Sequence, residues 1–330
     1  MTKLFKAKQH GKALIVFALL IFTFPSFADA TDNGFFIRKM ALRTGETSIA
    51  VIYPDIGEPY RSVFAQIISG IETKTPVVDY AVGANVNMEE LRNNLRQQNI
   101  KVVIALGRQG MKVASNLNMN IGVVVGGVIA SPENEMHNLP VNSLSPDPSL
   151  LFSQLRKIIP TVRRIFTVYD SHQNDWLIRI AKNAARTQGL ELVVYDVDDL
   201  KNAVRAYQDI FAIADSRQDA LWLLQDTTTV EDSTVLPLVL QESWSRNLAV
   251  FSSNFGHVKR GVLFSLYPDN TELGSHLAVM ALTFLVSGDY GEHGMILLRE
   301  VLTAINLRTA SHLGLSANRQ QDFDLVFPEQ

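Results

Sequence analysis

The chain has 330 residues, of which 47% are apolar and 19% charged, a balance that is typical of packed globular proteins and excludes a largely disordered chain. The formal net charge is -3 at pH 7, and because nucleic-acid binding needs clustered lysine and arginine, no nucleic-acid partner is expected. Cysteine is absent, which excludes disulfides, thiolate chemistry and cysteine-ligated metals.

Residues 1–30 have the pattern of an export signal. Four lysines within the first twelve residues precede an apolar run at 13–24, which is shorter than the stretch of about 20 residues that spans a membrane. The small residues that follow predict cleavage after Ala28 or Ala30. An uncleaved membrane anchor is the alternative. We expect a mature protein in the periplasm, without a lipid anchor because no cysteine follows the signal.

Apolar runs alternate with helical patterns along the first half of the mature chain. After a polar leader, strands are predicted at 48–53, 77–82, 102–106 and 121–125, and helices at 61–72, 88–98 and after residue 110. Strands that are apolar on both faces and alternate with helices indicate a parallel sheet covered on each side. This half is therefore predicted to form one α/β lobe.

The same alternation returns in the second half. Strands are expected at 164–169, 190–197, 220–225 and 249–253, and helices at 149–159, 174–188, 201–215 and 234–246. Between the halves, the segment 130–148 contains four prolines and is predicted to be a loop, with the first crossing between lobes at 142–145. Two alike lobes with facing strand ends predict a cleft between them.

The last part of the chain is expected to return to the first lobe and form part of it. A strand and turn at 259–268, a helix at 272–287, an extended stretch at 295–304 and a short helix at 306–314 are predicted. The resulting division has a signal peptide at 1–30, an N-terminal lobe at 31–145 and a C-terminal lobe at 146–267. Residues 268–330 are expected to return to the N-terminal lobe.

Three blocks of sequence resemble one group of ABC-transporter substrate-binding proteins, a group that includes binders of aromatic amino acids. They are residues 302–315, LTAINLRTASHLGL, residues 258–269 with Leu273 and Gly274, VKRGVLFSLYPD followed by LG, and residues 151–160, LFSQLRKIIP. The resemblance implies the two-lobed α/β fold of periplasmic binding proteins, with several hinge crossings, closing on a small solute. It also implies an inner-membrane ABC permease as the partner. Many members carry a lipid-anchoring cysteine, which this chain lacks.

The candidate ligand-binding residues follow from the strand ends, because ligands of parallel α/β sheets bind outside the carboxyl ends of the strands. In the first lobe, Arg108 follows a strand and opens a helix, where backbone N–H groups and the helix dipole favour an anion. Its guanidinium would clamp a carboxylate, and the alternative is a tight turn with a solvent-facing arginine. The whole set is Tyr60, Arg108, Gln109, Gly127, Tyr169, Asp170, Asp226, Thr227, Asn254 and Phe255.

Each second-lobe candidate has a functional and a structural interpretation. Asp170 or Asp226 would bind a ligand ammonium, or each would cap the helix that follows it, which is the more common role. Thr227 would donate a hydroxyl hydrogen bond or act as a cap. Asn254 offers an amide. The aromatic residues would form apolar walls of a pocket or belong to the ordinary core or its rim, namely Tyr60, Tyr169 and Phe255.

The sequence carries no motif that requires catalysis. Its seven histidines lack metal-ligand spacing, and neither a Gly-x-Ser-x-Gly elbow nor a dinucleotide fingerprint is present. We therefore expect no catalytic residue, metal or cofactor, and a monomeric protein that captures a small zwitterion or anion, such as an amino acid, for an ABC importer. The alternative is a module that senses a ligand and signals to a membrane receptor kinase or a cyclic-nucleotide signalling protein. A secreted α/β enzyme rests on the fold alone.

Overall fold

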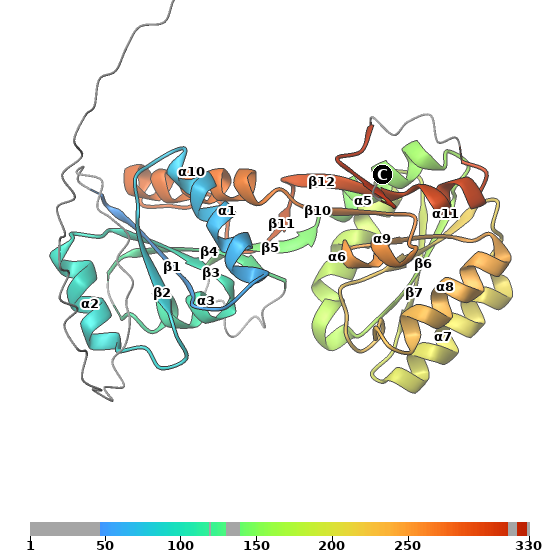
Figure 1. The fold of residues 1–330 in the computed structure, drawn as a ribbon, viewed down its shortest axis with the longest axis horizontal. Coiled ribbons are helices and arrows are strands. Elements are labelled where there is room, and N and C mark those ends of the chain that lie inside the picture. Colours follow the sequence, from blue (N-terminus) through green and yellow to red (C-terminus); the bar gives the residue numbers. More distant parts are fainter. Residues whose placement is uncertain (1–46, 119, 130–138, 316–321, 329–330) are drawn as a thin grey trace, which may run out of the picture. The chain divides into compact units, whose positions relative to one another are not determined.

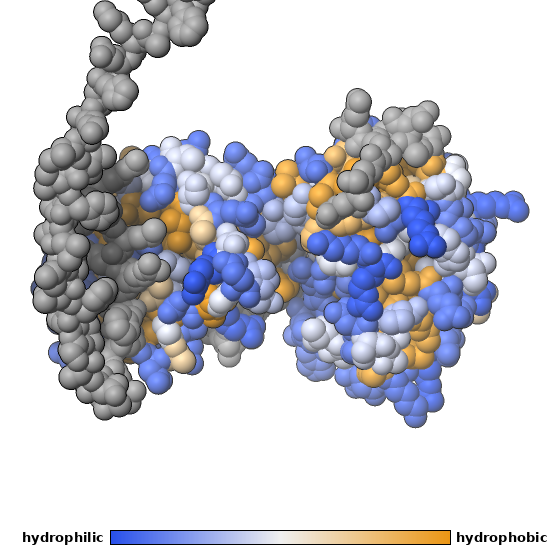
Figure 2. All heavy atoms as spheres, in the orientation of Figure 1, coloured by the Kyte–Doolittle hydropathy of each residue, from blue (hydrophilic) through white to orange (hydrophobic). Residues whose placement is uncertain are grey.

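The computed structural model describes residues 47–118, 120–129, 139–315 and 322–328 (Figure 1). The predicted signal peptide and leader lie outside the described residues. Among the helices of the described ranges, none combines the length and apolar character that a membrane crossing requires. On the face shown in Figure 2, hydrophilic residues predominate and hydrophobic residues form smaller areas between them.

The first sheet has six strands in the described chain, in the order β11-β5-β4-β3-β1-β2, and neighbouring strands are parallel. Helices α1 and α10 cover one face of this sheet and α2 and α3 cover the other (Figure 1). The strands are β1 (Ile49–Pro54), β2 (Val78–Val82), β3 (Val102–Leu106), β4 (Gly122–Val128), β5 (Pro140–Pro146) and β11 (Gly294–Leu298). The helices are α1 (Tyr60–Glu72), α2 (Met88–Gln97), α3 (Gly107–Ser115) and α10 (Asn270–Ser287).

The second sheet has seven strands in the described chain, in the order β13-β12-β10-β9-β8-β6-β7, with β10 and β12 antiparallel. One face packs against α5 and α6, and the other packs against α7 and α8. The strands are β6 (Arg164–Tyr169), β7 (Glu191–Asp196), β8 (Asp219–Leu223), β9 (Ala249–Ser252), β10 (Phe264–Pro268), β12 (Val301–Asn306) and β13 (Leu325–Phe327). The helices are α5 (Pro148–Ile158), α6 (Ser171–Thr187), α7 (Leu200–Ile213), α8 (Val235–Arg246), α9 (Gly256–Arg260) and α11 (Leu307–His312).

Strand β5 differs from the sequence prediction, which treats its segment as a loop because of its prolines. The prolines stand at the two ends of the strand, Pro140 and Pro146, and the residues between them are mostly buried. A proline removes one donor from a ladder and is tolerated at a strand end. Proline content therefore marked the ends of this strand.

The described chain passes between the two sheets at three places. It does so at Asp147 between β5 and α5, at Asp269 between β10 and α10, and at Arg299-Glu300 between β11 and β12. Asp147 N–H donates to Leu298 O at 2.9 Å, Asp269 N–H donates to Glu300 O at 2.9 Å, and the Arg299 guanidinium pairs with the Asp147 carboxylate. The three crossings are thus tied to one another by hydrogen bonds.

The sheet membership corrects two expectations about the C-terminal part. Residues 295–304, expected as one extended stretch, form two strands of different sheets, separated by Arg299-Glu300. Of residues 268–330, α10 and β11 go with the first sheet, whereas β12 and β13 pair in the second. Both strands are apolar and extended, so alternation along the sequence does not reveal the two-residue break between them.

Helix α10 is held to the first sheet by direct backbone contact with α1. A Cβ added at Gly70 would lie 1.9 Å from Thr271 O, and one added at Gly274 would lie 2.0 Å from Ile67 O. Only glycine at both positions lets the two helix backbones approach so closely. Gly274, which belongs to one of the sequence blocks that resemble the family, is therefore a packing residue where α10 contacts α1.

Candidate functional site

Asp226 follows β8 and joins two strand ends of the second sheet. Its side chain is buried, with the residue 3% exposed. Oδ2 accepts hydrogen bonds from the Asp170 N–H and the Asn174 amide, both at 2.9 Å, and Oδ1 accepts from the N–H groups of Thr228 and Thr229. Four acceptor positions are about the capacity of a carboxylate. Asp226 does not cap a helix, because the next helix, α8, begins only at Val235. Its carboxylate instead holds the turn at Thr228 and Thr229 and the end of β6.

Asp170 caps α6 and is also fully surrounded by donors. Oδ1 accepts from the His172 N–H at 2.9 Å and lies 3.0 Å from His172 Nδ1, and Oδ2 accepts from Gln173 Nε2 and the Thr228 hydroxyl, both at 3.2 Å. Burial by itself would raise the pKa of Asp170, but the hydrogen bonds from His172, Gln173 and Thr228 outweigh it and lower the pKa. The charge therefore persists at neutral pH.

The threonines beside Asp226 divide their roles. The hydroxyl of Thr228 donates to Asp170, and that of Thr229 donates to Val168 O at 3.3 Å. Thr227, the predicted donor, is exposed at this edge. The hydroxyls that hydrogen-bond at this edge are thus those of Thr228 and Thr229, the two residues after Thr227.

A third strand end of this edge is built around His257, which the sequence interpretation missed. His257 is 3% exposed, and its Nδ1 and Nε2 lie 2.9 Å from Ser252 Oγ and 3.2 Å from Asn254 Nδ2. Because Asn254 Oδ1 accepts from the Gly256 N–H at 2.9 Å, its amide nitrogen faces Nε2, and the proton of the neutral ring is on Nδ1. Burial is the largest cause that lowers the pKa of His257, to about 4. The network holds Asn254 in place.

Two of the predicted aromatic walls lie in apolar clusters. Tyr169 is 6% exposed and belongs to the main core of the second sheet. Phe255 packs against Tyr267 and Phe327, with ring centroids 4.8 Å and 5.8 Å apart. These contacts favour the core or rim interpretation for both, whereas Tyr60 is 62% exposed at the start of α1.

The first sheet places its candidates around the start of α3. The Gln109 amide donates to Val82 O at 3.2 Å and to Gly83 O, which ties α3 to the end of β2. Arg108 is exposed in the first turn of α3. Gly127, at the end of β4, has φ +73°, and a Cβ there would lie 3.5 Å from Gly107 N. The structure thus brings Arg108, Gln109 and Gly127 to one edge.

Glycine spacing explains how α3 approaches the sheet. Gly107 has φ +68°, a conformation that side chains disfavour, and a Cβ at Gly110 would lie 2.7 Å from Ile52 O. The helix therefore starts directly after β3 and packs on β1 without an intervening side chain.

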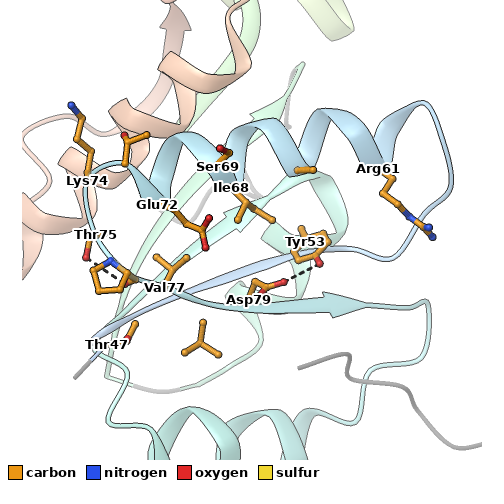
Figure 3. A pocket seen from close by; sticks show the side chains of 14 residues that line it. Thr47, Tyr53, Arg61, Ile68, Ser69, Glu72, Lys74, Thr75, Val77 and Asp79 are labelled. Carbon is orange, nitrogen blue, oxygen red and sulfur yellow. Dashed lines mark hydrogen bonds between the residues drawn. The ribbon is translucent and has the colours of Figure 1, made fainter. Parts of the chain in front are cut away.

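A cavity of about 690 Å³ lies along the edge of the first sheet, between α1 and β2 (Figure 3). The Tyr53 hydroxyl donates to Asp79 at 3.1 Å on its wall, and Arg61 and Glu72 of α1 also line it. None of the ten candidate residues lines this cavity in the described chain. It follows the edge strand, so we do not assign it to the strand-end site. Within the described ranges, no group of three metal-ligating side chains is assembled.

Comparisons with known proteins agree on the kind of molecule. A family model for ABC transporter substrate-binding proteins matches residues 69–320. A substrate-binding protein with adhesive properties from Clostridium difficile, in a ligand-free open structure, is 14% identical with a TM-score of 0.62, over 85% of this chain and 99% of that one. The ABC domain from Streptococcus pneumonia in complex with L-Trp is 14% identical with a TM-score of 0.51, over 85% and 100%.

A conserved domain protein from Vibrio cholerae is 17% identical with a TM-score of 0.51, over 85% of this chain and 99% of that one. Among curated proteins none is significantly similar. The structural similarities show the fold of two-lobed periplasmic binding proteins. The fold class and the resemblance inferred from the sequence are thereby confirmed.

Proposed function

Because the chain belongs to the ABC transporter substrate-binding protein family, we propose that it captures a small zwitterionic or anionic solute for an ABC importer of the inner membrane. The observation that carries the proposal is that an arginine stands at one strand-end edge and two carboxylates stand at the other. Arg108 stands at the edge of the first sheet, and the carboxylates of Asp170 and Asp226 stand at the edge of the second. An amino acid carries the complementary pair of charges.

The roles we propose for the candidates follow from their surroundings. Arg108 binds the ligand carboxylate, since an arginine fork matches it bidentately. The ligand ammonium is attracted by Asp170, whose charge is kept by its hydrogen bonds. The oxygens of both Asp170 and Asp226 already accept hydrogen bonds, so we propose that Asp170 attracts the ammonium by its charge, without a direct hydrogen bond, and that Asp226 positions Asp170. Secondary contacts are proposed for Tyr60, Gln109, Gly127, Tyr169, Thr227, Asn254 and Phe255.

The proposed mechanism is closure of the two lobes on the ligand, with the three crossings as the hinge. Ligand that binds the closed state better shifts the population toward it, and no chemical step is needed. We propose that the permease of the importer recognises the closed state of the protein. We further propose that residues 1–30 direct export to the periplasm, where such a partner would meet the protein.

A thermal-shift screen against amino acids and related metabolites tests the proposal. A ligand at 100 times its dissociation constant should add about 2.7 kcal/mol to the free energy of unfolding. Arg108→Ala should remove the shift caused by a carboxylate ligand and leave the unliganded melting temperature nearly unchanged. Lys112→Ala, a change of another basic residue on α3, is the matched control and should keep the shift. An unaltered ligand shift in Arg108→Ala would take this residue out of the site.

A further inference from the structure

A second cavity, of about 400 Å³, lies at the opposite edge of the second sheet from Asp170 and Asp226. It is formed by the end of α8, the start of β9, the end of α9 and by α11. Leu248 and Val250 line it at the amino end of β9, and Gly261 lines it shortly before β10 begins. The proposed solute site occupies the carboxyl ends of strands in this sheet, and the two sites approach each other only at α9, where Lys259 of the cavity lies over Phe255.

The side chains around this cavity have one sign of charge. The charged lining residues are Lys259, Arg260 and Arg308, and none of the described lining residues is an aspartate or glutamate. Arg260 is partly neutralised, because its guanidinium lies 3.1 Å from Asp232. The chain as a whole has a formal net charge of -3, so a locally basic cavity is not a consequence of overall composition.

Aromatic rings hold two of these cations without neutralising them. Arg308 lies over Trp244, with its guanidinium carbon 6.0 Å from the ring centroid. The ammonium of Lys259 lies 5.3 Å from the Phe255 ring and 5.4 Å from the Phe327 ring. A cation over a ring face is attracted by the ring quadrupole and keeps its full charge. Arg308 therefore stays available to an anion in the cavity, whereas the Lys259 ammonium lies over rings that do not line the cavity and adds its positive charge from beside it.

Trp244 forms a fixed wall of the cavity although it is 40% exposed. The His312 ring stacks on it with centroids 3.6 Å apart and planes 7° apart, and His312 Nε2 lies 2.9 Å from Trp244 O. Two contacts between the same residues fix their relative position. A rigid wall means that a ligand need not order this side of the site when it binds.

We propose that this cavity binds a phosphate group, either as free phosphate or as the headgroup of an anionic lipid. Phosphate presents several strong acceptor oxygens and up to two negative charges. Arginine donates to such oxygens in a planar fork, and lysine adds a point charge. A donor-rich wall without carboxylates suits this group and disfavours a cation or a neutral solute.

The two sources of phosphate are tested separately with the purified protein. Inorganic phosphate is titrated calorimetrically in chloride buffer of matched ionic strength, and sedimentation is measured with vesicles of phosphatidylglycerol and phosphatidylethanolamine against vesicles of phosphatidylcholine. We expect saturable binding in at least one arm. Binding of inorganic phosphate assigns the site to the free anion. Sedimentation with the anionic vesicles alone assigns it to a lipid headgroup.

Variants decide whether the cavity is responsible. The double substitution Lys259→Gln and Arg308→Gln should weaken binding at least tenfold in the arm that shows it, with each single substitution giving a smaller loss. Both side chains are exposed, so thermal melting should show folded variants. Arg246→Gln, which changes a basic residue of α8 that is paired with Glu242, is the matched control and should bind normally. Undiminished binding by the double variant, or no saturable binding by the unmodified protein in either arm, would overturn the proposal.

Discussion

At the carboxyl edge of the second sheet, the side chains of Asp170, Asp226 and Thr228 connect neighbouring strand ends through hydrogen bonds. At the corresponding edge of the first sheet, the close contacts are made by backbone at Gly107 and Gly110. One edge is therefore sensitive to the loss of a polar group, and the other is sensitive to added volume. The difference teaches that two lobes of similar architecture can organise their strand ends by different physical means.

The strongest test of this comparison removes one acceptor from the second edge. Asp226→Asn places an NH₂ group where a carboxylate oxygen accepts backbone N–H groups, leaving buried donors unpaired. We expect the free energy of unfolding to fall by about 4 kcal/mol, measured by urea denaturation. The exposed Asp209→Asn is the control and should be nearly neutral. A loss below about 1 kcal/mol would show that Asp226 does not organise the edge.

Acid should weaken the same edge through His257. Its folded pKa of about 4 lies below the ordinary value of 6.5, so the unfolded chain binds more protons between these values. The contribution of the neutral ring is present above pH 6.5 and is lost as the pH falls toward 4, by up to about 3 kcal/mol. Denaturation curves at pH 7 and 4.5 should differ less for His257→Gln than for the unmodified protein. Equal pH dependence in the two proteins would contradict the assignment.

Added volume should damage the first edge. Gly110→Ala brings a Cβ within 2.7 Å of Ile52 O, and because the obstacle is backbone, the helix must shift. We expect a loss of about 2 kcal/mol in the free energy of unfolding. Gly83→Ala is the matched control, since a Cβ there meets nothing within 4 Å. If both substitutions had the same effect, close backbone packing would not distinguish this edge.

The smallest expected effect concerns Gln109, a side chain that links α3 to the end of β2 at the first edge. Gln109→Ala removes the amide that donates to Val82 O and Gly83 O. A loss of about 1 kcal/mol is expected, because the Val82 carbonyl still accepts a hydrogen bond from the Asp55 N–H when the amide is removed. Chemical denaturation beside Arg108→Ala, which should be close to neutral, measures it. A loss as large as that of Asp226→Asn would erase the contrast between the edges.

The sequence supports the fold class and the family because both depend on patterns that are local in the chain. Alternating apolar runs and helical periods locate most strands, and three short blocks carry the family resemblance. The break at Arg299-Glu300 escapes such patterns, since the segments on both sides are apolar and extended. Strand β5 escapes them because its prolines resemble those of a loop.

The candidate site is less accessible to sequence reasoning because its contacts are long-range. The acceptor pattern of Asp226 depends on Asp170 and Asn174, more than fifty residues earlier in the chain. The capping role of Asp170 can be predicted from the helix pattern that follows it, whereas Asp226 is followed by a turn and not by a helix. His257 was considered only as a metal ligand, and its pairing with Ser252 needs the turn after β9 to be known. Which residues touch the ligand stays a prediction.

The crossing points described above set an order of assembly during synthesis. Residues 270–298 leave the second sheet between its strands β10 and β12 and supply α10 and β11 to the first. The first sheet consequently lacks an edge strand and a covering helix until residue 298 has emerged, although most of its strands are made early. Strand β10, in turn, waits for β12 as its antiparallel neighbour. The first sheet can therefore be completed only after residue 298, and β10 has neighbours on both sides only after residue 306.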